Sequence, residues 1–206
     1  MSAWRWLPLV LLVGCVPGRG QRVPEETLAR IPFAGRVELL DAEDELALAH
    51  QRVAEAARDQ EKLQEEIRDA EAHLDTAEAA ARRQKSPKLE QLAVDEARAR
   101  LKYLYARDDA EKRNRKAAEL QLQCAEARLE LARVKVAQKA KIEGADQLPV
   151  EQFEKQVDRC SAQLEERHVE LRTQQAQMRA ARSDWEARRL ALDSAAQGPE
   201  VIPFLR

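Results

Sequence analysis

Glycine, proline and aromatic residues are scarce in this 206-residue chain, and their scarcity excludes several classes of protein. Six glycines and eight prolines occur, and aromatic residues make up only 4% of the sequence. So few aromatics argue against a compact core that encloses a pocket. The formal net charge is −2, so there is no basic excess to bind nucleic acid through its phosphates. Glycine-rich phosphate loops and Gly-x-Ser-x-Gly or Cys-x-x-Cys motifs are also lacking, and we expect neither an enzyme nor a small-molecule substrate.

What the chain does contain is charge and helix-forming residues, with 35% of its positions Asp, Glu, Lys or Arg. Apolar residues recur every three or four positions, which is the pattern of a coiled coil. Ser86-Pro87 and Gly144 interrupt this pattern, because proline suits the first turn of a helix and glycine the position after its end. The sequence therefore predicts an all-α domain over 37–196, with helices at about 37–84, 87–142 and 149–195.

The apolar stripes also predict how the three helices pair. If the chain reverses at 85–86, large residues face small ones at nearly every level, as Leu74 faces Ala97 and Ala70 faces Leu101. In the same register Gln60 lies opposite Glu111. The second helix carries a second stripe, so it should lie in the middle. We expect an elongated antiparallel coiled-coil hairpin or three-helix up-down-up bundle, which closes on itself or pairs with another chain.

The amino-terminal residues form a different kind of segment, in which one cation, Arg5, precedes a short apolar run. This is the pattern of a secretory signal, too short to span a membrane. The run ends in Leu12-Val13-Gly14-Cys15, which resembles the lipobox of bacterial lipoproteins. The resemblance covers only the first 15 residues. It implies removal of a signal peptide at 1–14, with cleavage between Gly14 and Cys15, and acylation of Cys15.

The same resemblance places the mature chain in the cell envelope. By the family's sorting rule, Val16 rather than Asp after the cysteine favours the inner leaflet of the outer membrane, facing the periplasm. Residues 15–36 would then be the lipidated terminus and a flexible tether, and 197–206 an extended tail. A plain signal with a chance cysteine is the alternative.

A polar stretch at 107–116 interrupts both stripes of the second helix. Asp108, Glu111 and Arg115 within it could contact a partner, or could fix the register of the helices at some cost in stability, and we favour the second interpretation.

Aromatic residues and the tail give two further candidate contacts. Trp185 should lie near Tyr105, as a platform for a glycan or, in preference, as packing within the bundle. Phe204 in the tail could dock on a partner or pack against the last helical turns.

Histidines and cysteines suggest no metal or cofactor site. The three histidines match no metal spacing, and only Glu165 and His168 have the Glu-x-x-His spacing, of which a di-iron bundle needs two copies. The expected register places Cys160 opposite Leu131, about 10 Å along the axis from Cys124. That distance is too long for a disulfide, so we expect two buried thiols.

These observations favour a lipid-anchored structural or interaction protein of the cell envelope. It would act as a periplasmic helical spacer or scaffold that recruits or braces partner proteins, or associates with itself, through its helix faces. One alternative is a periplasmic module that binds unfolded clients or cell-wall polymer. Another is a cytosolic coiled coil whose first residues mimic a signal.

Overall fold

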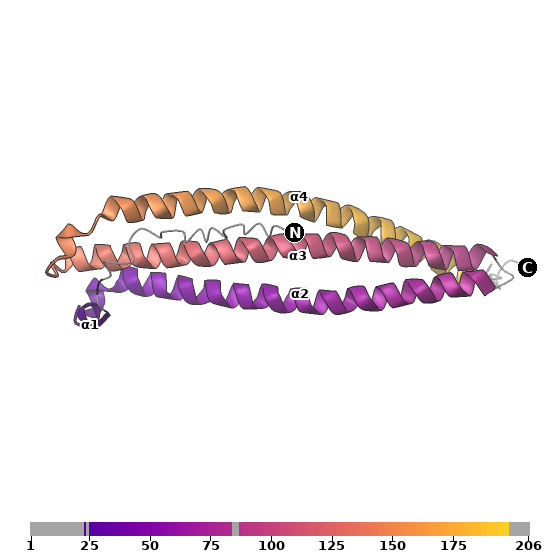
Figure 1. Cartoon of the computed structure of the whole chain (residues 1–206), viewed down its shortest axis with the longest axis horizontal. Helices are drawn as coiled ribbons and strands as arrows, with labels where there is room; N and C mark the ends of the chain where they lie inside the picture. Colours follow the sequence, from indigo (N-terminus) through magenta and orange to yellow (C-terminus); the bar gives the residue numbers. More distant parts are fainter. Residues whose placement is uncertain (1–22, 24, 84–86, 198–206) are drawn as a thin grey trace, which may run out of the picture.

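The computed structural model describes residues 23, 25–83 and 87–197, and this part of the chain is entirely without strands. Its elements are α1 (Glu25–Ala29), η1 (Phe33–Gly35), α2 (Val37–Arg83), α3 (Pro87–Lys139), η2 (Ala145–Gln147) and α4 (Val150–Ala196). The three long helices run up, down and up beside one another and form an elongated rod (Figure 1). The expected all-α fold is confirmed.

The end of α3 differs from the sequence prediction by three residues and has a clear structural cause. Lys141 adopts the left-handed conformation, with φ of 53°. Its N–H donates to the carbonyl of Gln138, and the N–H of Ile142 donates to that of Ala137, both at 3.0 Å. These two bonds form a Schellman motif, which ends the helix at Lys139. Gly144, which we expected to be this stop, instead precedes η2 with φ of 81°.

The best-packed part of the rod is the α2–α3 hairpin. Leu63, Ile67, Ala70 and Leu104 form one buried cluster, and Leu63 is fully excluded from solvent. A second cluster lies near the α1 end of the hairpin and contains Leu39, Ala42, Leu129, Val136 and Ala137, together with Leu28, Ile31 and Ala145. Burial of these side chains provides most of the free energy that holds the hairpin together.

The α3–α4 interface is shallower. On the α4 side, α3 buries mainly small residues: Ala99, Ala110, Ala117, Cys124, Ala127 and Val134. In contrast, Cys160 is the single buried residue of α4. As expected, α3 lies between α2 and α4 (Figure 1), and these outer helices make no sustained contact within the described residues. The apolar stripe of α4 therefore stays half-exposed.

Both helix pairs differ in register from the sequence prediction. Gln60 contacts Arg115 rather than Glu111, a shift of about one turn. Cys160 lies opposite Cys124 rather than Leu131, which is a full heptad. The connector causes the larger shift, because it turns back over the end of α3 and buries Ala145 there. As a result, the first residues of α4 lie beside the last turns of α3 rather than level with its end.

Part of the segment that we expected to be a flexible tether is folded. Five residues of this segment, Glu25–Ala29, form α1. Leu28 and Ile31 are 3% and 8% exposed and pack into the cluster at this end of the hairpin. Residues 1–22 and 24 lie outside the described part, so the prediction of a tether there stays a prediction. None of the described helices is long and apolar enough to cross a bilayer.

Candidate interaction surfaces

Asp108, one of the three candidate contact residues in the polar stretch at 107–116, lies inside the α2–α3 interface. It is 6% exposed. Its carboxylate accepts a hydrogen bond of 2.8 Å from the Gln64 amide and pairs with Lys112 at 2.6 Å. The bond from Asp108 raises the pKa of Lys112 above its ordinary value, despite partial desolvation. With both bonds made inside the rod, Asp108 is poorly placed to meet a partner.

The rest of the polar stretch also contacts neighbouring helices. Arg115 donates to Gln60 on α2 at 3.2 Å and to Glu119 at 2.9 Å. Arg107 pairs with Glu66 on α2 at 2.9 Å, and Arg113 approaches Glu170 on α4 at 3.6 Å. Glu111 accepts a hydrogen bond of 3.3 Å from Asn114. These contacts tie α3 to both neighbours, which favours the interpretation of the stretch as a device that fixes register.

Trp185 is part of the α3–α4 contact. Its ring stacks on Tyr103, with centroids 5.4 Å apart and planes 8° from parallel. The indole N–H donates to Glu96, which is 8% exposed, at 2.6 Å. Because one face of Trp185 is covered by Tyr103, the geometry favours packing over a glycan platform.

Tyr105, which we expected beside Trp185, lies elsewhere. Its hydroxyl donates to Glu71 on α2 at 2.6 Å, and this bond raises the pKa of Tyr105. Tyr103 and Tyr105 are two residues apart, about 200° around α3, so Tyr103 lies on the face toward α4 and Tyr105 on the face toward α2.

Cys124 and Cys160 form a disulfide between α3 and α4, so the prediction of two separate thiols is wrong. Their Cα atoms are 5.5 Å apart, a distance typical of a disulfide. The prediction failed because it placed the reversal at the middle of the connector. The sequence did carry a usable signal, since moving α4 by one heptad preserves its apolar stripe and brings the two cysteines level.

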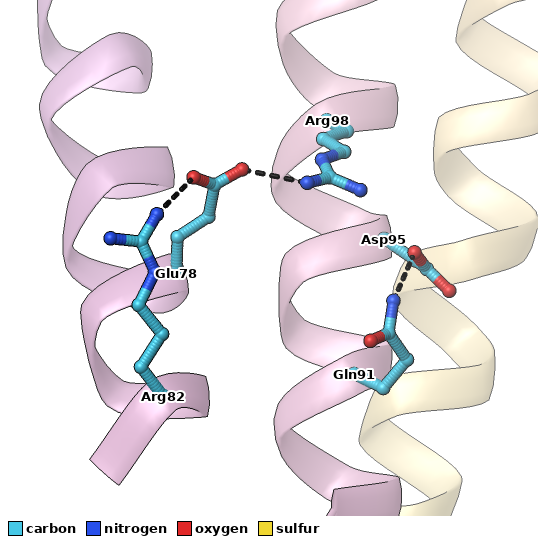
Figure 2. A network of polar contacts seen from close by, with 5 residues as sticks. All are labelled: Glu78, Arg82, Gln91, Asp95 and Arg98. Atoms are coloured by element: carbon cyan, nitrogen blue, oxygen red, sulfur yellow. Dashed lines mark hydrogen bonds and ion pairs between the residues drawn. The ribbon is translucent and has the colours of Figure 1, made fainter.

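Salt bridges connect α2 and α3 at both ends of the hairpin. Figure 2 shows Glu78 of α2 between Arg82 of the same helix, at 3.6 Å, and Arg98 of α3, at 2.8 Å. Gln91 and Asp95, bonded at 3.0 Å, form a separate pair along α3 (Figure 2). Exposed pairs of this kind contribute little stability individually but add to the specificity of pairing.

At the opposite end of the hairpin, Lys139 pairs with Glu38 at 2.6 Å. The hydrogen bond and charge of Lys139 lower the pKa of the Glu38 carboxyl below its ordinary value.

An open cleft of about 1130 Å³ lies at the α1 end of the rod. Its apolar lining includes Ile31, Val37, Val136 and Ile142, and Arg30 and Lys141 are among the charged residues at its rim. It lies close to where the undescribed amino-terminal segment joins the fold. No signal in the sequence predicted this cleft, because it arises from packing of α1 and η1 against the hairpin.

The remaining candidate residues divide between weak contacts and the undescribed part. Glu165 and His168 approach within 4.0 Å on the surface of α4. Within the described ranges, no three His, Cys, Asp or Glu side chains gather in a way that could hold a metal ion. Gly14, Cys15 and Phe204 lie outside the described residues. The chain matches no protein-family model, no curated protein and no solved structure.

Proposed function

We propose that this chain is a lipid-anchored scaffold of the bacterial cell envelope, held at Cys15 and exposed to the periplasm. The Cys124–Cys160 disulfide is the observation that supports this best, because structural disulfides persist in oxidising compartments such as the periplasm and are rare in the cytosol. It therefore agrees with the export signal that the lipobox implies, and it disfavours the alternative of a cytosolic coiled coil.

The shape of the rod supports a structural role rather than catalysis. α3, the longest helix, has 53 residues, so the rod extends about 80 Å. Its buried charges are held by neighbours inside the fold, as Asp108 and Glu96 show. A rod of this kind acts by holding partners at a set distance from the bilayer.

Cell fractionation with Cys15→Ser tests the anchor. The wild-type chain should sediment with the membrane and have an intact mass that shows a start at Cys15 with added acyl groups. Cys15→Ser should leave the membrane fraction, whereas the matched variant Cys160→Ala, at another cysteine, should stay in it. A wild-type chain that starts at Met1 with an unmodified Cys15 would refute the proposal.

The cleft at the α1 end favours a second candidate function, the binding of an apolar client segment. Its test is titration of the purified chain with an apolar fluorescent dye. A saturable 1:1 signal that Ile142→Asp abolishes, while Leu48→Asp on the exposed surface of α2 leaves it intact, would support binding in the cleft. A signal that both variants leave unchanged would contradict it.

A further inference from the structure

The outward face of α4 carries a second heptad stripe, whose positions are all exposed. Its eight positions alternate between steps of four and three residues, and each is exposed and uncharged. They are Val169, Thr173, Ala176, Ala180, Ser183, Ala187, Leu190 and Ser194. Two of them are large apolar residues, with Val169 50% exposed and Leu190 66% exposed. This stripe lies on roughly the opposite side of α4 from the stripe that packs on α3.

The outward face of α2 shows that such a stripe is not a general property of these helices. Its equivalent stripe is uncharged at Ala47, Gln51 and Ala54 but is then interrupted by four consecutive charges, Arg58, Glu61, Glu65 and Arg68. Single exposed apolar residues need no explanation, but a heptad stripe of small and apolar residues without a charge has the spacing of a coiled-coil seam. The second half of α4 therefore presents a seam without a partner.

The charged residues along one edge of this seam favour a second copy of α4 as its partner. Arg172 and Arg179 flank its first half, and Glu186 and Asp193 flank its second half on the same edge, each seven residues from the next. Arg172, Glu186 and Asp193 also form pairs within α4, but these pairs are exposed and weak, so a second copy can compete for them. When two copies of α4 pair antiparallel, the same edge of each helix meets. Arg172 then faces Asp193 of the second copy, and Arg179 faces Glu186. Each opposite-charge pair occurs twice in the dimer, because a two-fold interface is self-complementary.

The same register fits the seam residues themselves. It places Leu190 against Thr173 of the second copy and Val169 against Ser194. At the centre, Ala180 meets Ser183, so small residues let the helices approach closely. Parallel pairing in register would instead stack Leu190 on Leu190 and Val169 on Val169, so neither large residue would face a small one.

We propose that two copies of this chain associate through the outward face of α4, antiparallel and about a two-fold axis close to position 182. This inference rests on the proposed scaffold role and gives its self-association a face and an orientation. Association through α4 does not require the lipid, so it can be tested on unacylated protein. A negative result would therefore leave the proposed lipid anchor untouched.

Sedimentation analysis of the full chain carrying Cys15→Ser, with its disulfide intact, tests the face. The parent should change from monomer to dimer as its concentration rises. Arg179→Glu sets carboxylates opposite one another at two places and should weaken the dimer about tenfold. Adding Glu186→Arg restores opposite charges, so the double variant should return to within about twofold of the parent. Arg68→Glu on α2 makes the same charge change on an exposed face and should have no effect.

A distance measurement between spin labels tests the orientation. A nitroxide attached through Ser194→Cys in the Cys15→Ser background should give a distance of roughly 40 Å between the two copies of an antiparallel dimer. A parallel dimer would place these labels side by side, and a short distance would overturn the proposal. The proposal would also be overturned if the parent stayed monomeric at hundreds of micromolar. The same holds if the double variant dimerised as weakly as Arg179→Glu. Circular dichroism of each variant confirms that the fold is retained.

Discussion

Removing the disulfide should release α4 while leaving the α2–α3 hairpin folded. Cys124 and Cys160 are 36 residues apart, and closing a loop of that length stabilises a fold by about 4 kcal/mol through the entropy of the unfolded chain. α4 has little else to replace that contribution, since Cys160 is its single buried residue. The hairpin keeps its own core around Leu63, which is fully buried.

Hydrogen exchange read by mass spectrometry on the native protein, oxidised and reduced, measures this difference. Reduction should speed exchange of α4 amides by up to about a thousandfold, the equivalent of 4 kcal/mol. The exchange rates of the α2 and α3 amides around Leu63 and Leu104 should rise far less. A variant with Cys124→Ala and Cys160→Ala controls for the reductant, because its exchange should be the same with and without it.

Two outcomes would refute this reasoning. Equal acceleration across all three helices would mean that the rod unfolds as one unit and that α4 is not held mainly by the bond. Two free thiols in protein purified without reductant would mean that the bond does not form in the cell.

Three further substitutions test the packing described above. Leu63→Ala should lower the free energy of urea unfolding by about 3 kcal/mol, whereas Leu48→Ala, at a residue 56% exposed, should change it little. Trp185→Phe leaves the nearly buried carboxylate of Glu96 without its donor and should lower thermal stability by about 1–3 kcal/mol, whereas an exposed platform residue would leave melting unchanged. Glu38→Gln should destabilise at pH 7 by about 0.5 kcal/mol or less, because that residue is exposed. The pKa of Glu38 is lowered in the folded state, so its stabilising contribution is present above pH 4.5 and is lost as the pH falls through that lowered pKa. The free energies of urea unfolding of parent and variant should therefore converge at low pH.

The sequence predicted the long helices well because their apolar spacing and breaks are local features. The start of α3 at Pro87 and the central position of α3 followed from the position of proline and from its two stripes. The register between helices did not follow, because heptad patterns repeat and a slip of seven residues preserves every apolar layer. The path of the connector removes that ambiguity, and Lys141 in the left-handed conformation has no distinctive sequence signal.

The same ambiguity decided which site predictions failed. The missed disulfide follows from one heptad of misplacement in α4. Tyr103 rather than Tyr105 meets Trp185 for another reason, because Tyr105 lies on the face of α3 that contacts α2. The folded segment around Leu28 and Ile31 was missed for a different reason. Its two buried side chains lie among prolines and glycines, a composition typical of linkers, and only the end of the hairpin gives them a surface to pack on.

An odd number of long helices has a topological consequence. In a hairpin of two long helices, the end of the second helix would lie beside the start of the first. With three, the last helix leaves its carboxyl end about 70 Å away from α1, at the far tip of the molecule (Figure 1). The start of α1 and the end of α4 are therefore separated by the length of the rod.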